Sequence, residues 1–418
     1  MKKNGFTLVE ITVCVVLLVT IFLLVVPKVN TMINNKKKNA YNSLISTVKD
    51  AAQAYVYLNV NIVDDAIESQ GYYEVSIRTL QENELLENKL ENPLTGKNIP
   101  STSIVKIIKN NEEYIYKFSL DYQYLLEHII DLYSSEETRT SNGLKKDNTE
   151  DKNIRYYGSD PNNYVSFNNE LWRIIGVFGN NVKLVRKDSL GSLSWDSSES
   201  SINGGFGVNE WSQADLKNYL NTMYYGGTTV TCYDGTKNST TTCPTNILDN
   251  TAKTLIDNHT WNTGAIEYNT RTDTVAFYKD ERGNQTGKIC NGGTFCSDTV
   301  ERTTTWTGYI GLPYPTDYAY ASGENICETN MVKQDSSDAY ICENNNWMFK
   351  SIWYWTLSPF ARSANSRYVW YVNGDGDVNN SNAASGGAVF PAIYLKSNVL
   401  IESGAGTSSN PYILKAGS

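Results

Sequence analysis

An uncharged apolar run near the start of the 418-residue chain, Ile11 to Pro27, constrains the fold more than any other feature of the sequence. A run of this kind predicts a helix that crosses a membrane, and we place that helix at residues 6–27. The run leads into Lys28 without the small-residue site that ordinary signal peptidases require. The apolar helix is therefore expected to stay attached to the rest of the chain.

A short basic leader precedes the run and ends in the motif Gly5-Phe6-Thr7-Leu8-Val9-Glu10. The order and spacing of residues 1–30 resemble the N-terminal signal of type IV prepilins and pseudopilins. This resemblance implies that a prepilin peptidase removes residues 1–5 by cutting between Gly5 and Phe6, and methylates the new N-terminus. It also implies that the partners are the membrane and other pilin or pseudopilin subunits, in a type IV filament or a type II secretion machine.

Glu10 is unusual because a carboxylate inside a membrane helix is costly unless it is paired. The amine that cleavage creates at Phe6 would neutralise the Glu10 of a neighbouring subunit, which gives Glu10 an assembly role. The alternative is that Glu10 only reaches the interface of a simple anchor. The charge count disagrees with the expected orientation, since Lys28 and residues 36–38 outnumber the lysines of the leader.

The segment after the run predicts a long helix followed by a small sheet. One apolar stripe recurs at three- and four-residue steps, at Tyr41, Leu44, Ile45, Val48, Ala51, Ala52, Tyr55 and Leu58. Two β-rich runs, Ser103–Ile108 and Tyr114–Phe118, predict a hairpin. A long helix on a small antiparallel sheet resembles the pseudopilin headgroup, which we place at residues 28–133. Residues 134–153 are polar and charged, and predict a linker.

Residues 154–418 are expected to form an extracellular second domain. It starts with a meander of three β-rich runs, Tyr164–Phe167, Leu171–Phe178 and Val182–Arg186. Three later segments resemble the C-type lectin-like fold of formylglycine-generating enzymes and bacterial surface proteins: Trp355–Pro359, Tyr368–Val372 and Pro391–Leu395. The expected fold class is thus α+β: a transmembrane helix, a pilin-like headgroup with a small antiparallel sheet, and a C-type lectin-like domain.

Six cysteines outside the apolar run fall into three close pairs. Closure of short loops favours pairing of neighbours among the 15 connectivities that six cysteines allow, namely Cys232 with Cys243, Cys290 with Cys296, and Cys327 with Cys342. Such disulfides indicate an oxidising compartment outside the cytoplasm. The alternative is six reduced, buried cysteines.

Signals for catalysis and for metal binding are weak. The chain has two histidines, His128 and His259, and no C-x-x-C pair, so we expect no metal and no cofactor. We find no nucleophile elbow and no glycine-rich phosphate loop. The reactive late cysteines of formylglycine-generating enzymes have no counterpart after Cys342. A net charge of −9 argues against nucleic acid as a partner. Binding is therefore favoured over catalysis, although paired carboxylates stay open as an alternative.

The lectin-like resemblance implies a ligand surface on the late strands and loops. Its candidate residues are Trp353, Trp355, Arg362, Asn365, Arg367, Tyr368, Asn373 and Asp375. Core packing explains the tryptophans equally well. The acidic segment Asn373–Asn380 could suit calcium, but its turn-forming residues favour a turn between strands.

These observations predict a minor pilin or pseudopilin that displays an adhesin-like domain for an unidentified glycan or protein. The expected location is the cell membrane, crossed once, with a cytoplasmic N-terminus and the later domains outside, and membership of a surface filament is left open. One alternative is a display protein that does not polymerise. Another is a surface enzyme, which clustered carboxylates in a cleft would indicate.

Overall fold

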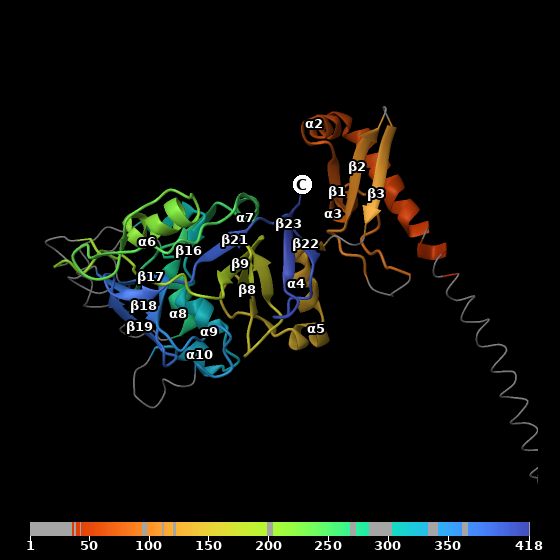
Figure 1. Cartoon of the computed structure of the whole chain (residues 1–418). Coiled ribbons are helices and arrows are strands. Elements are labelled where there is room, and N and C mark those ends of the chain that lie inside the picture. The colour runs from red at the N-terminus through yellow and green to blue at the C-terminus, as the bar shows by residue number, and fades with distance from the viewer. Residues whose placement is uncertain are drawn as a thin grey trace, which may run out of the picture. The chain divides into compact units, whose positions relative to one another are not determined.

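The computed structural model describes residues 36, 39–41, 43–93, 98–110, 113–119, 123–198, 204–267, 273–283, 303–332, 342–361 and 367–417. The chain divides into two compact units, Met1–Gln123 with Ser418, and Tyr124–Gly417 (Figure 1). Each unit has a separate hydrophobic core.

The first unit packs helices on a three-stranded antiparallel sheet. Residues 43–58 are helical, and Val48, Ala52 and Tyr55 bury one face of this helix in the core. Leu58 departs from the predicted stripe, because its side chain is 65% exposed. The other elements are α2 (Val60–Gln70), β1 (Tyr73–Ser76), α3 (Ile77–Glu82), β2 (Ile104–Asn110) and β3 (Glu113–Ser119), with the strands in the order β1-β2-β3.

The predicted membrane helix requires a correction. Among the described residues, no helix is both long enough and apolar enough to cross a membrane. The helix at residues 43–58 is amphipathic: its apolar face packs on the three-stranded sheet of the first unit, and its polar face points outward. The expectation of a single-pass membrane protein with a cytoplasmic N-terminus is therefore contradicted. Residues 6–27, on which it rested, lie outside the described residues.

The expected fold class is wrong for the same reason. In place of a transmembrane helix, a pilin-like headgroup and a C-type lectin-like domain, the chain is mixed α/β with many strands, at 28% helix and 32% strand.

The second unit is built on a large sheet of ten strands. Its main path runs β16-β21-β9-β8-β7-β23-β22-β4, and β6 pairs with both β8 and β5. Figure 1 labels β16, β21, β9, β8, β23 and β22 of this sheet. The strands are β4 (Gln123–Tyr124), β5 (Leu144–Lys146), β6 (Ile154–Tyr156), β7 (Tyr164–Phe167), β8 (Glu170–Phe178), β9 (Asn181–Arg186), β16 (Ile310–Gly311), β21 (Ala392–Leu395), β22 (Val399–Ser403) and β23 (Tyr412–Ala416). The predicted meander is confirmed, since β7, β8 and β9 are antiparallel neighbours.

The turn between β7 and β8 shows why the meander was readable. Asn168 and Asn169 have φ values of +57° and +55°. Two consecutive left-handed residues make the tight turn that matches the twist of a hairpin, and asparagine tolerates that conformation.

A second sheet and several small elements complete this unit. The second sheet has the order β10-β20-β17-β18-β19, with β14 parallel to β17. Its strands are β10 (Ser192–Ser194), β14 (Ile266–Glu267), β17 (Tyr354–Ala361), β18 (Tyr368–Val372), β19 (Val378–Asn382) and β20 (Gly386–Ala388). Two two-stranded antiparallel sheets add β11 (Cys232–Tyr233) with β12 (Thr240–Thr241), and β13 (His259–Asn262) with β15 (Thr305–Gly308).

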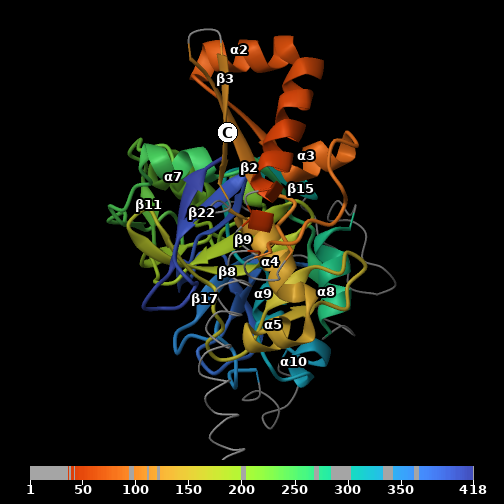
Figure 2. The ribbon, with the colours of Figure 1, turned by 90° about the vertical axis from the view of Figure 1, so that its right-hand side faces the viewer.

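Helices cover the large sheet and fill its edges. Helix α4 lies against β8 and β9 and buries Leu125, Leu126 and Ile129 (Figure 2). The helices are α4 (Leu125–Ser134), α5 (Glu136–Ser141), α6 (Asp215–Asn218), α7 (Asn250–Leu255), α8 (Thr274–Glu281), α9 (Pro315–Tyr320) and α10 (Ile326–Thr329), with a 3-10 turn at Trp211–Gln213 and a π-helix at Tyr219–Tyr224.

The structure divides the chain earlier than the sequence suggested. Residues 134–153, interpreted as a linker, contain α5 and β5. Ser135 caps α5 by accepting a hydrogen bond from the backbone of Thr138, and Leu144 is buried in the core. The polar composition of this segment concealed the helix cap and the buried leucine from the sequence-based prediction. The compact unit starts at Tyr124 rather than at residue 154.

The first and last residues of the second unit lie next to each other. Strand β23 runs parallel to β7 inside the large sheet. Gly417 then donates its backbone N–H to the carbonyl oxygen of Asn398 at 2.9 Å. A Cβ placed on Gly417 would lie 3.1 Å from a ring carbon of Tyr124.

Candidate functional site

The two tryptophans proposed for ligand stacking belong largely to the packing of the second sheet. Trp355 is fully buried, and its indole N–H donates to the carbonyl of Leu193 at 2.9 Å. Trp353 is half-buried, with its ring centroid 5.1 Å from that of Trp355 and 5.2 Å from that of Tyr371. The core-packing alternative therefore describes Trp355, whereas Trp353 keeps part of its ring at the surface.

The polar candidates that the structure describes do not converge on one pocket. Arg367 donates to the hydroxyl of Tyr368 at 3.1 Å, and its guanidinium lies 4.5 Å from the ring centroid of Phe206. Asn373 donates to Asp377 at 3.0 Å across the turn between β18 and β19, the turn that also contains Asp375.

This arrangement is a strand-to-strand turn, as the composition indicated. Within the described ranges, no group of three or more histidines, cysteines or acids is placed to hold a metal ion.

Several predicted sites lie outside the described residues. These are the processing and assembly positions Gly5, Phe6 and Glu10, the ligand candidates Arg362 and Asn365, and the pair Cys290 and Cys296. Their proposed roles stay predictions.

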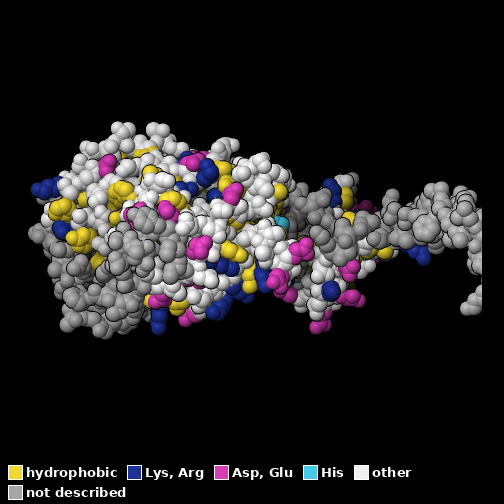
Figure 3. Space-filling view, turned by 90° about the horizontal axis from the view of Figure 1, so that it is seen from below, with side chains coloured by type: hydrophobic (Ala, Val, Ile, Leu, Met, Phe, Trp, Pro, Cys, Tyr) yellow, Lys and Arg dark blue, Asp and Glu magenta, His cyan; other side chains and the backbone are white. Residues whose placement is uncertain are grey.

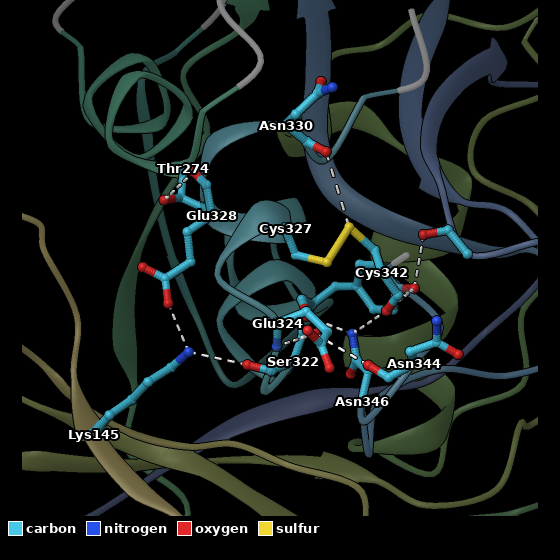
Figure 4. Close-up of a disulfide and its surroundings, with 12 residues drawn as sticks. Lys145, Thr274, Ser322, Glu324, Cys327, Glu328, Asn330, Cys342, Asn344 and Asn346 are labelled. Carbon is cyan, nitrogen blue, oxygen red and sulfur yellow. Dashed lines mark hydrogen bonds and ion pairs between the residues drawn. A yellow bond between two sulfur atoms is a disulfide. The ribbon is translucent and has the colours of Figure 1, made fainter. Parts of the chain in front are cut away.

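Two of the predicted disulfides are confirmed. Cys232 pairs with Cys243, and Cys327 pairs with Cys342, with Cα separations of 5.2 and 5.3 Å. The second bridge joins α10 to the segment that begins at Cys342 (Figure 4). Beside it, Lys145 makes an ion pair with Glu328 at 2.7 Å.

The segment that follows Cys342 is held firmly. The Asn346 side chain donates to the carbonyl of Cys342 at 2.9 Å. Trp347 donates its backbone N–H to Gly158 at 2.8 Å and its indole N–H to Tyr156 at 2.9 Å. These bonds fix the backbone that carries Met348 and Lys350 against the large sheet.

A hollow that the sequence did not reveal lies between this segment, the large sheet and Phe390. Its cavity volume is about 10 Å³, room for about one water molecule. Its walls combine four cations with apolar and aromatic side chains and contain no acid: Arg173, Val185, Arg186, Lys187, Trp347, Met348, Lys350, Tyr354 and Phe390. We call this site the cationic pocket.

Arg173 forms a fixed wall of the cationic pocket. Its guanidinium donates to Asn163 at 2.6 Å and to the carbonyl of Pro161 at 3.2 Å. The same group lies 3.9 Å from the ring centroid of Tyr164 and 4.8 Å from that of Trp347. Its acidic neighbour, Asp160 at 3.3 Å, has a side chain that is 63% exposed, so water weakens the pairing.

The charges of Arg186 and Lys187 are balanced locally. Arg186 makes a two-pronged contact with Glu170, at 2.9 and 3.2 Å. Lys187 lies at the rim, 3.4 Å from Asp188, with both side chains exposed. Neither residue supplies a strong uncompensated charge.

Lys350 differs from the other three cations. Its side chain is half-buried, and its Nζ makes no hydrogen bond or ion pair with any residue that the structure describes. The nearest aromatic ring is that of Phe390, with its centroid at 5.7 Å. Burial, with a contribution from the positive charges of Arg173 and Lys187, lowers the pKa of Lys350 to about 8. At pH 7 the amine is still mostly protonated; the charge of Asp188 acts on it, but no acid that the structure describes makes an ion pair with it.

One signal in the sequence could have pointed to this site. Arg173 interrupts an apolar strand between Trp172 and Ile174, and a charge in a buried strand calls for an explanation. The rest of the pocket could not be assembled from sequence, because Lys350 and Phe390 come from segments far from β8.

Comparison of the chain with protein-family models, with curated proteins and with solved structures finds no match. The resemblances to pilins and to lectin-like domains therefore rest on the sequence motifs alone.

Proposed function

We propose that the second unit is a non-catalytic binding domain, and that its cationic pocket holds a carboxylate of the ligand. The observation that carries this proposal is the unpaired ammonium group of Lys350 beside Arg173. A partly desolvated charge is unfavourable until a partner of opposite sign completes it. A carboxylate would supply that partner through charge-assisted hydrogen bonds.

The size of the pocket restricts what enters it. A cavity of about 10 Å³ has room for about one water-sized group, so only a small end group of a ligand can enter it. Val185, Met348 and Phe390 offer apolar contacts beside the cations. A carboxylate, whether it belongs to a sugar acid or to a peptide, is a small anionic end group of this kind, and its hydrocarbon stem would lie against the apolar side chains.

The surface around the described residues does not provide a general positive field. In Figure 3, lysines and arginines alternate with acids as small groups among uncharged polar side chains. The net charge of the chain is −9. A concentrated group of cations around one hollow therefore supports local recognition of an anion rather than non-specific attraction.

The lining of the pocket favours binding over chemistry. It contains no acid, histidine or cysteine, and no serine or threonine that could serve as a nucleophile. Its one hydroxyl, on Tyr354, donates to the carbonyl of Met348 at 3.1 Å and is fully buried. The carboxylate pair of a surface glycosidase is not found in this pocket.

The test is a titration of the full chain with acetate, propionate and the neutral analogue propan-1-ol, followed by the fluorescence of the buried tryptophans. Propionate should bind better than acetate because of the apolar wall, and propan-1-ol should not bind. Lys350→Met should weaken propionate binding at least about tenfold, the loss expected for a hydrogen bond to a charged group. The control Lys396→Met, at an exposed lysine, should leave binding unchanged. Equal binding by Lys350→Met, or no preference for propionate over propan-1-ol, would refute the proposal.

A further inference from the structure

Two oppositely charged side chains contact each other in the interior of the second unit. Neither of them lines the cationic pocket. Lys183 of β9 and Asp317 of α9 place Nζ and Oδ2 2.6 Å apart, and both side chains have 0% exposure. The two residues are 134 positions apart in the sequence. The fold therefore delivers an amine to a carboxyl group in a place that water does not reach.

Aromatic rings surround the amine. Nζ of Lys183 lies 4.1 Å from the ring centroid of Tyr314, and 5.3 Å from those of Trp261 and Tyr394. All three rings are buried. In such surroundings a charged pair loses much of its advantage over the neutral amine and acid, because neither ion is hydrated.

The two oxygens of Asp317 have different partners. Oδ1 accepts a hydrogen bond from the guanidinium of Arg155 at 2.6 Å. Oδ2 accepts from the amine of Lys183 and from the backbone N–H of Tyr314, the latter at 2.9 Å. The cation on Oδ1 is placed to stabilise negative charge that develops on that oxygen.

We propose that Lys183 and Asp317 become joined by a spontaneous amide bond between Nζ and Cγ. One proton first passes from Nζ to Oδ2 along their hydrogen bond. The neutral amine then attacks Cγ, and the electron pair of the carbonyl bond moves to Oδ1, where Arg155 stabilises the oxyanion. The carbonyl re-forms, the Cγ–Oδ2 bond breaks, and Oδ2 leaves as water with a second proton from the nitrogen. No oxidant or other reactant is needed.

The buried groups around the pair support this chemistry. Burial lowers the pKa of Lys183 to about 8, although Asp317 opposes the shift, so the free amine is accessible near neutral pH. Burial raises the pKa of Glu281 to about 7, so this residue exchanges a proton in the same range. Thr316, the neighbour of Asp317, donates to the Glu281 carboxylate at 3.3 Å.

The ion pair itself slows the reaction. Burial alone would raise the pKa of Asp317, but the charges of Lys183 and Arg155 hold it below its usual value. The reactive neutral pair is thus a minor form. Fixed proximity compensates for this, since an oriented intramolecular attack replaces a bimolecular encounter. We expect the bond to form slowly after folding, not during it.

Bond formation leaves the remaining buried charges paired. Arg155 keeps its contact with Asp147 at 2.9 Å, and Arg282 keeps its contact with Glu281 at 3.1 Å. The reaction removes the positive charge of Lys183 and the negative charge of Asp317 together, so no other buried charge is left without a partner.

The test is mass spectrometry of the purified full chain, unfolded, reduced and digested. We expect one branched peptide that joins the segments containing Lys183 and Asp317, lighter by one water, about 18 Da, than the sum of its parts. The pair of Lys145 and Glu328 is an internal control in the same digest. Its atoms are equally close, at 2.7 Å, but its side chains are 21% and 17% exposed, so it should remain unlinked (Figure 4).

Variants separate the chemistry from the packing. Lys183→Met removes the nucleophile and should abolish the branched peptide. Asp317→Asn keeps an acyl carbon and should form the same link with loss of ammonia, about 17 Da. Glu281→Gln should slow the appearance of the link. If aged wild-type protein gives only separate linear peptides with Lys183 and Asp317 intact, the contact is an ordinary buried ion pair and the proposal is wrong. That result does not depend on whether any variant folds.

Discussion

Replacing Lys350 by methionine should stabilise the second unit while removing its binding of carboxylates. Methionine is close to lysine in length, has no charge, and its thioether packs well on irregular apolar walls. It would lie beside Met348 and Phe390 in the cationic pocket. A gain in stability with a loss of function is the expected signature of a residue kept for binding.

The magnitude follows from the pKa of Lys350. A fall from 10.5 to about 8 corresponds to about 3 kcal/mol of unfavourable free energy for the charged form in the folded state. Because the side chain is only partly buried, solvent screening reduces the expected gain to about 2 kcal/mol.

The sign of the pH dependence is fixed by linkage. Between pH 8 and 10.5 the unfolded chain binds more protons at this lysine than the folded chain does, so the stability of the wild type rises with pH in that window. The penalty is complete below pH 8 and disappears towards pH 10.5. The advantage of Lys350→Met should therefore be largest at pH 7 and shrink above pH 8.

Urea unfolding followed by tryptophan fluorescence measures this difference cleanly. All nine tryptophans lie between residues 172 and 370, within the second unit, so tryptophan fluorescence reports the unfolding of that unit alone. A gain of about 2 kcal/mol moves the midpoint by about 0.7–1 M urea for a slope of about 2–3 kcal/mol/M. Lys396→Met, at an exposed position, should not move it. A destabilised Lys350→Met variant at pH 7, or a gain that persists unchanged at pH 10, would show that Lys350 has a partner in solution and that the reasoning is wrong.

Three further predictions concern other parts of the chain. Burial lowers the pKa of His128 to about 4, so the contribution of this neutral histidine to the free energy of unfolding should be full above pH 6.5 and should fall as the pH drops towards 4. His128→Gln should flatten the curve of unfolding free energy against pH in that window. Replacing Cys327 and Cys342 by serine opens a loop closed over 15 residues and should lower the free energy of unfolding by about 3 kcal/mol. The urea midpoint should fall accordingly, and an unchanged midpoint would show that the disulfide does not constrain the chain. N-terminal sequencing of protein from its native host should find Phe6 first, and an intact leader would rule out prepilin-type processing.

Local features of the fold were predictable from sequence because they depend on neighbours in the chain. The three β-rich runs predicted the meander of β7, β8 and β9, and close spacing predicted the bridge between Cys232 and Cys243. The linker interpretation of residues 134–153 was misleading because composition averages over a segment. A single buried leucine, Leu144, and one helix cap are enough to hold such a segment to the core.

The sites depend on long-range geometry and were hidden for that reason. Arg173 and Lys350 meet at the cationic pocket across 177 positions, and Lys183 meets Asp317 across 134. Arg173 stands out in its apolar strand, but neither it nor the other three residues indicates by itself which residue it meets. The lectin-like resemblance drew attention to Trp355, which packing accounts for, because a motif identifies a strand but not which of its faces is exposed.

The adjacency of Tyr124 and Gly417 has a practical consequence. Because the first and last residues of this unit are adjacent, the unit is suited to domain insertion: it can be placed inside a loop of a host protein without separating the two ends of that loop. The same closure permits circular permutation, in which a short bridge joins residue 417 to residue 124 and new ends are opened at an exposed turn such as Asn168–Asn169. A permuted chain that still recognises carboxylates would make this unit a portable sensor module.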